Sequence, residues 1–175
     1  ICFRRDLPVE PLISGGSGID SFNHAMPDRL PERLEGGTIN VPGIAGLGAG
    51  IGYLLKNDLQ VMGKKTIALA DQFAHQVQQN SNVKIYTNLA APHVGTIGLN
   101  IAGINSADVS DYLTTQGIAT RSGAHCAPLI HHALGTVEQG IVRFSFCSFN
   151  TMADVEAAST AVNKIAKMMR ENHGE

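Results

Sequence analysis

A cysteine in a loop of small residues is the first candidate for chemistry in this sequence. Cys126 lies within residues 121–128, which read RSGAHCAP. Arg121 and His125 are close to it in the sequence, and a helix beginning at Pro128 would place its N-terminus nearby. Each of these features can favour the thiolate over the thiol. Because the thiolate is the form that attacks sulfur or carbon, the segment indicates a nucleophilic cysteine.

Other interpretations of the same segment stay open at this point. A buried cysteine often behaves as a small hydrophobic residue, and Cys126 could be one. His125, Cys126, His131 and His132 could instead bind a metal, but a closed tetrahedral set lacks a nearby carboxylate or second cysteine. His125 could assist proton transfer at the cysteine, because the pKa of imidazole is about 6.5, or it could only orient the loop.

Arg143 is the second candidate for chemistry. It interrupts the apolar run 141–146, which reads IVRFSF. A charge inside an apolar strand needs a polar partner. A planar guanidinium binds a carboxylate through two parallel hydrogen bonds, so Arg143 is a candidate to hold an acidic ligand. The alternative is an arginine at a strand edge that faces solvent.

The elements that must position these residues alternate between helices and strands. Helices are predicted near 42–55, 62–79, 107–116, 128–134 and from 151 to about 170. Strands are predicted at 1–3, 11–13, 83–86, 96–101, 118–120 and 141–146. Thr151 and Asp154 have the spacing of a helix-capping pair. This alternation predicts an α/β fold, with one sheet and helices packed on a face.

The helix near Pro42 carries most of the longest weakly polar run, 41–55. That run is shorter than the ~20 residues that span a bilayer and is rich in glycine. We therefore predict a buried helix and no membrane span.

The overall composition fits a packed globular protein. Of 175 residues, 43% are hydrophobic and 16% are charged. Thirteen basic and fifteen acidic side chains give a net charge of −2, so nucleic acid or an anionic membrane is not expected as a partner. Three cysteines without a CxxC pair favour a reducing compartment, and no signal peptide is visible, so a cytoplasmic location is expected. The first residue is Ile1 and not methionine, which suggests a piece of a longer protein.

Three motifs together resemble a known family. Residues 121–129 resemble the active-site cysteine loop of cysteine desulfurases in the class V aminotransferase superfamily. Residues 15–18 and 35–47 look like that family's glycine-rich turn and its E-x-G-T-x-N-x-x-G segment. Residues 142–145 and 149–151 resemble its strand with an arginine and the helix cap that follows. The motifs come in the family's order, and the resemblance covers essentially the whole chain.

The resemblance implies a fold and a domain organisation. The family has the fold-type I architecture of pyridoxal phosphate (PLP)-dependent transferases. By this resemblance the chain is the C-terminal part, with residues 1–60 as a remnant of the large domain and a linking helix. Residues 61–175 would form the small α/β domain with the cysteine loop.

The resemblance also implies roles for particular residues. Cys126 would take the sulfur of L-cysteine as a persulfide while alanine leaves; His125 beside it is our second catalytic candidate from its residue type, not from the resemblance. Arg143 would bind the substrate carboxylate, and Arg121 would position the substrate or the loop. Thr38 would contact the cofactor phosphate of the partner subunit in a homodimer. A sulfur-acceptor protein, for example in iron–sulfur cluster assembly, would then receive the sulfur; no metal, nucleic acid or membrane is implied.

The family's residues that hold the cofactor all precede the matched region. These are the Schiff-base lysine, the aspartate at the pyridine nitrogen and the histidine stacked on the ring, so we expect the 175-residue chain alone to be inactive. Two further hypotheses remain: a class V aminotransferase or selenocysteine lyase, and a non-catalytic dimerisation or acceptor-binding module. Plain aminotransferases need no loop cysteine, so Cys126 favours sulfur or selenium chemistry.

Overall fold

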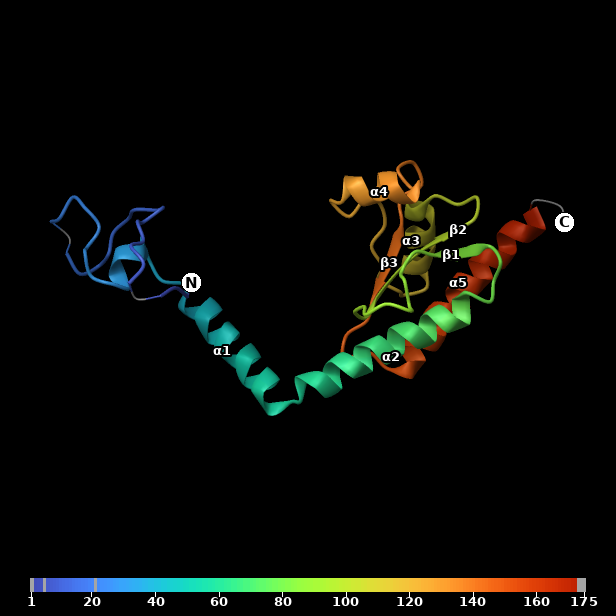
Figure 1. The fold of residues 1–175 in the computed structure, drawn as a ribbon, viewed down its shortest axis with the longest axis horizontal. Helices are drawn as coiled ribbons and strands as arrows, with labels where there is room; N and C mark the ends of the chain where they lie inside the picture. The colour runs from blue at the N-terminus through green and yellow to red at the C-terminus, as the bar shows by residue number, and fades with distance from the viewer. Residues whose placement is uncertain (1, 5, 21, 173–175) are drawn as a thin grey trace. The chain divides into compact units, whose positions relative to one another are not determined.

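The computed structural model describes residues 2–4, 6–20 and 22–172, with side chains up to residue 168. The chain divides into two compact units, Ile1–Lys56 and Asn57–Glu175, which are described separately. Their α-helices and β-strands are labelled in Figure 1.

The first unit holds a short 3-10 helix, η1 (Glu32–Leu34), and the helix α1 (Val41–Lys56). The strands predicted at 1–3 and 11–13 are wrong: residues 2–3 and 11–13 are irregular, and residue 1 lies outside the described residues. A strand needs a hydrogen-bonded neighbour, and no strand pairing occurs among the described residues of this unit.

Glycines bring two loops of the first unit into backbone contact. The Gly37 amide donates to the Gly16 carbonyl at 3.2 Å. A Cβ at Gly15 would lie only 3.1 Å from the Gly37 nitrogen. Because backbones approach this closely only without side chains, the glycine-rich turn and the segment before Thr38 form one structural feature.

The helix predicted near Pro42 is confirmed as α1, and the Asn40 side chain accepts a hydrogen bond from the Gly43 amide at 3.0 Å. The prediction that this helix is buried is wrong for the described chain, in which none of its residues is buried. Leu47, for example, is 64% exposed. Periodicity shows that a helix has an apolar face but does not supply a surface to cover it. The described residues include no helix long and apolar enough to cross a membrane.

The second unit contains a three-stranded antiparallel sheet in the order β1-β2-β3. Its elements are α2 (Leu59–Val77), β1 (Val83–Ile85), β2 (Thr96–Ile101), α3 (Ser106–Thr115), α4 (Pro128–Leu134), β3 (Val142–Ser145) and α5 (Met152–Asn172). Across β2 and β3, Ile97 is opposite Phe144 and Gly98 is opposite Arg143. The predicted α/β class is therefore observed in this unit.

The core of the second unit lies between one face of this sheet and the helices α2, α3 and α5. Because side chains alternate along a strand, Leu99 and Phe144 point into the core while Gly98 and Arg143 belong to the opposite face. The Phe73 ring of α2 lies 4.5 Å from that of Phe144, between centroids. Figure 1 shows α2 and α5 side by side, with α4 apart from both.

The strand predicted at 118–120 is wrong. Gly117 ends α3 with a φ of 74°, and the Ile118 amide donates back to the Leu113 carbonyl at 2.9 Å. The segment therefore completes the C-terminus of α3. The chain joins the sheet at the next residue, Arg121, which forms an isolated antiparallel bridge with Arg143.

The predicted capping pair at the start of α5 is confirmed. The Thr151 amide donates to Asp154 Oδ2 at 2.8 Å, and the Asp154 amide donates to Thr151 Oγ1 at 3.4 Å. The Asp154 carboxylate accepts from the Thr151 amide and also from the Thr151 hydroxyl at 3.1 Å, and these two hydrogen bonds, the backbone one first, hold the pKa of Asp154 below its ordinary value.

Candidate active site

The cysteine loop is fixed to the start of β3 by backbone hydrogen bonds. The Arg143 amide donates to the Arg121 carbonyl at 2.7 Å, and the Arg121 amide donates to the Arg143 carbonyl at 3.2 Å. Two residues along, the Ile141 amide donates to the Gly123 carbonyl at 3.2 Å. The loop therefore begins as a continuation of the sheet, which places Arg121 beside Arg143.

Gly140 makes this close approach possible. It has a φ of +68°, and an added Cβ would lie 2.4 Å from Ser106 Oγ and 2.9 Å from Gly123 Cα. The Gly140 carbonyl also accepts a buried hydrogen bond from Asn100 Nδ2 at 2.7 Å. A side chain at position 140 would push the loop away from β3.

His125 and Cys126 both have left-handed backbone conformations, with φ values of 50° and 57°. Non-glycine residues rarely adopt this region, and each instance costs about 1–3 kcal/mol. Hydrogen bonds hold the turn: His125 Nε2 bonds the Ile141 carbonyl at 2.9 Å, and the Ala127 amide donates to the Ala124 carbonyl at 2.9 Å. The result is an exposed Cys126, so the interpretation of this cysteine as a buried hydrophobic residue is wrong.

Of the three features expected to favour the thiolate, Arg121 makes a direct contact. Its Nη2 lies 3.9 Å from Cys126 Sγ. Burial lowers the pKa of the His125 imidazole, so this ring favours the thiolate less than an ordinary histidine would. The nearby charges of Arg143, Arg121 and His131 act in the same direction, and the hydrogen bond to Ile141 opposes them. The third feature is the N-terminus of α4, and this helix is only seven residues long.

A cavity of about 300 Å³ lies between the cysteine loop, α4 and the face of the sheet that carries Arg143. Its walls include Tyr86, Gly98, His125, Ile130, Ile141 and Arg143. Most of this lining is apolar, with the guanidinium of Arg143 as its charged group. Such a site suits a small ligand that carries a carboxylate.

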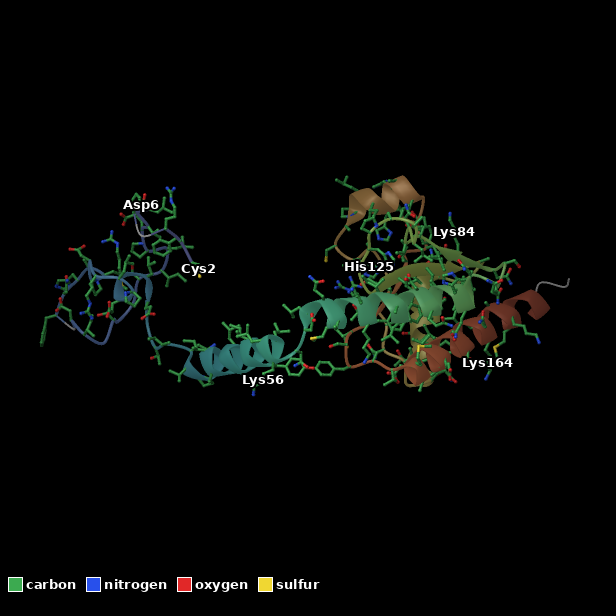
Figure 2. The ribbon with its side chains drawn as sticks, turned by 60° about the horizontal axis from the view of Figure 1, so that its bottom comes forward. Cys2, Asp6, Lys56, Lys84, His125 and Lys164 are labelled. Carbon is green, nitrogen blue, oxygen red and sulfur yellow. The ribbon has the colours of Figure 1, made fainter. Side chains whose placement is uncertain are left out.

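The structure thus brings together four of the five predicted site residues. Cys126, His125, Arg121 and Arg143 lie on the cysteine loop and on the strand bonded to it. His125 is labelled in Figure 2. Thr38 is exposed and belongs to the first unit, and the structure does not place it with the other four.

His131 and Thr136 form a buried pair that the sequence did not reveal as such. His131 Nδ1 lies 2.9 Å from Thr136 Oγ1, and the His131 ring is stacked on that of His125 with 6.2 Å between centroids. The sequence signal for this pair was a glycine, Gly135, at the end of the predicted helix. In the structure Gly135 is left-handed, and the Thr136 amide donates to the His131 carbonyl at 2.9 Å. Among the described residues, no group of three histidine, cysteine or acidic side chains is arranged to hold a metal.

Comparison with known proteins identifies the family. The family model for class V aminotransferases matches residues 1–158. The chain belongs to this family. It is 33% identical to a probable cysteine desulfurase of Haemophilus influenzae over 93% of the chain and 37% of that protein.

Solved structures of class V relatives have the same fold. A crystal structure of the cysteine desulfurase CsdA from Escherichia coli matches with a TM-score of 0.76 and 27% identity, over 91% of this chain and 39% of that one. The apo structure of a cysteine desulfurase from Thermococcus onnurineus matches with a TM-score of 0.76 and 30% identity, over 90% and 40%. The predicted fold-type I architecture is therefore confirmed. The chain spans about two fifths of the length of these relatives.

PLP-dependent enzymes of this fold need a lysine to anchor the cofactor, and the described site does not provide one. No lysine and no acidic side chain lines the cavity under the cysteine loop. Lys65, on α2, donates to the Ser148 carbonyl at 2.7 Å. The site in this chain therefore does not fit the cofactor by itself, although it can supply a nucleophile and a carboxylate-binding group.

The contact between Arg121 and Cys126 predicts the reactivity of the thiol. Arg121→Gln should slow alkylation of Cys126 by the uncharged reagent iodoacetamide about threefold at pH 7, because a nearby cation favours the reactive anion. Serine would replace Cys2 and Cys147 in every variant, since both are exposed free thiols. The difference should shrink in about 1 M salt, which screens exposed charges. An equal loss of rate in Lys164→Gln, far along α5, would contradict the assignment to Arg121.

Proposed function

We propose that this chain is part of a cysteine desulfurase that moves sulfur from L-cysteine to Cys126 as a persulfide and releases alanine. The observation that carries the proposal is the exposed Cys126, held in a left-handed turn 3.9 Å from the Arg121 guanidinium. The Arg143 cavity lies beside the same loop. The similarity to proteins named cysteine desulfurases supports the same reading.

Arg143 and Cys126 have separate parts in the proposed reaction. Arg143 would bind the substrate carboxylate, which fixes the amino acid before bonds near its α-carbon change. The Cys126 thiolate would attack the substrate sulfur, so an S–S bond forms and the C–S bond breaks. The electron pair of that C–S bond stays with the carbon that becomes alanine, which gains a proton. PLP would have to be held by residues outside this chain, and when bound there it would supply the electron sink for this chemistry.

The exposure of Cys126 favours delivery to a second protein. A persulfide on an exposed loop can be reached by an acceptor thiol, as sulfur supply to iron–sulfur cluster assembly requires. We include in the proposal a cytoplasmic homodimer in which Thr38 of one subunit contacts the cofactor phosphate of the other. Thr38 follows Gly37, whose amide is bonded to the Gly16 carbonyl, and a hydroxyl in such a glycine-rich turn can donate to a phosphate oxygen.

The experiment that tests the function uses a longer gene product that contains these residues and binds PLP. Wild-type protein and Cys126→Ala would be given L-cysteine, and both sulfide and alanine would be measured. We expect the wild type to release both in the presence of a reductant and Cys126→Ala to release neither, because the nucleophile is lost. If Cys126→Ala matched the wild type in transaminating another amino acid, the aminotransferase hypothesis would replace this one. A strong preference for selenocysteine would favour the lyase.

The 175-residue chain alone should form no alanine from L-cysteine, even with added PLP. The reason is the absence of an anchoring lysine at the site, which leaves the cofactor without a Schiff base. Alanine above the rate of a buffer blank with the same PLP would contradict this expectation.

A further inference from the structure

Two buried polar atoms of residues that line the Arg143 cavity have no hydrogen-bond partner among the described residues. They are Arg143 Nε and His125 Nδ1. An unpaired buried polar group costs about 1–3 kcal/mol, so two of them in one cavity call for an explanation. Both belong to residues that the bonded loop and strand hold close together.

The two atoms are chemically complementary. The guanidinium Nε–H is always a donor. The carbonyl of Ile141, 2.9 Å from His125 Nε2, can only accept, so this nitrogen carries the proton of the neutral ring. Burial lowers the pKa of His125, which keeps the ring neutral. His125 Nδ1 is then a buried acceptor, and Arg143 Nε–H is a buried donor on a residue that lines the same cavity.

We propose that His125 is a positioning residue for Arg143: its Nδ1 accepts the Arg143 Nε–H once a small rotation of the two side chains closes the pair, whose two atoms are unpartnered in this structure. His125 would then fix the plane of the guanidinium, leaving its Nη groups for the substrate carboxylate. The consequence for catalysis rests on the proposed function, but the hydrogen bond does not. This role differs from proton transfer at Cys126, because a buried Nδ1 and an Nε2 bonded to Ile141 leave no nitrogen for the thiol.

The surroundings of His125 restrict its ring to this orientation. His131 on α4 is 3% exposed and stacks on the ring of His125. His131 is itself held by Thr136, which is 2% exposed. The cationic or titratable groups that face His125 are Arg143 on β3, Arg121 on the loop and His131 on α4. All of them disfavour a proton on Nδ1.

A pair of substitutions separates the two nitrogens of His125. In His125→Gln the amide can still donate to the Ile141 carbonyl, but nothing replaces Nδ1. In His125→Asn the side-chain oxygen can replace Nδ1, but the bond to Ile141 is lost, and asparagine tolerates the left-handed conformation. The measurement is the solvent exchange rate of the Arg143 Nε–H in the 175-residue chain labelled with 15N-arginine. Its resonance is assigned by its absence from Arg143→Lys.

We expect exchange at least about fivefold faster in His125→Gln than in wild type, and within about twofold of wild type in His125→Asn. Unchanged exchange in His125→Gln would overturn the proposal. Faster exchange in His125→Asn than in His125→Gln would also overturn it, because the bond from His125 Nε2 to the Ile141 carbonyl, and not Nδ1, would then protect the Arg143 Nε–H. Neither readout needs cofactor or activity, so a failure of the proposed function would leave this test intact.

The wild-type chain provides a second test that requires no folding of a variant. As pH falls through the lowered pKa of His125, Nδ1 takes a proton and stops accepting. The protection of the Arg143 Nε–H, corrected for intrinsic exchange, should therefore persist near neutral pH and be lost as His125 titrates, below the ordinary imidazole pKa. Protection that stays constant while the His125 ring itself takes up its proton, followed by the chemical shift of the ring, would overturn the proposal.

Discussion

Arg143→Gln should lower kcat/KM for L-cysteine about a hundredfold in a PLP-binding protein that contains these residues, which corresponds to about 2.7 kcal/mol of transition-state stabilisation. Glutamine keeps two polar atoms but removes the charge and the fork of parallel donors. Arg143 lies in a mostly apolar cavity, where a charge-assisted bond counts for more than in water. Most of the loss should appear as a raised KM, because the carboxylate is bound in both the ground state and the transition state.

Two companion variants make this result interpretable. Arg143→Lys keeps the charge without the planar fork, and it should recover only part of the loss. Lys84→Gln removes one positive charge from the exposed side of β1, and it should leave kcat/KM within about twofold of wild type. If Arg143→Gln left KM and kcat/KM unchanged, the carboxylate would be bound elsewhere and the assignment of Arg143 would be wrong.

The sequence predicted those elements whose signals are local. β2 was predicted with its observed bounds, Thr96–Ile101, because alternating isoleucine and leucine follow a glycine. α4 was predicted over Pro128–Leu134 because proline opens it and Gly135 closes it. The capping pair before α5 also depends on residues three apart. Each of these elements is specified by neighbouring residues.

Features that depend on distant residues could not be predicted in the same way. Residues 118–120 have the composition of a strand, but their first amide is used to cap α3. The left-handed turn at His125 and Cys126 depends on the Ile141 carbonyl, which lies sixteen positions away. Chemistry could therefore be predicted at Cys126 and Arg143 from residue type and resemblance, whereas the role of each His125 nitrogen required the three-dimensional contacts.

Phe73→Ala should destabilise the second unit by about 3–5 kcal/mol, a large part of the stability of a domain of this size. Phe73 is completely buried, and its ring lies 4.5 Å from Phe144 and 5.4 Å from Phe146, between centroids. Removal of the ring loses apolar burial and two aromatic contacts and leaves a cavity beneath β3. The measurement is urea unfolding followed by circular dichroism.

The control for this prediction is the same substitution at an exposed phenylalanine. Phe22 is 97% exposed in the first unit, so Phe22→Ala should change the free energy of unfolding by less than about 0.5 kcal/mol. The strand that carries Phe144 also carries Arg143, so a loosened β3 should affect the site. Faster exchange of the Arg143 Nε–H in Phe73→Ala, under conditions where the unit is still folded, would show that the core beneath the sheet helps to hold the guanidinium. A Phe73→Ala protein as stable as Phe22→Ala would instead mean that the α2 face of the sheet is not the core of this unit.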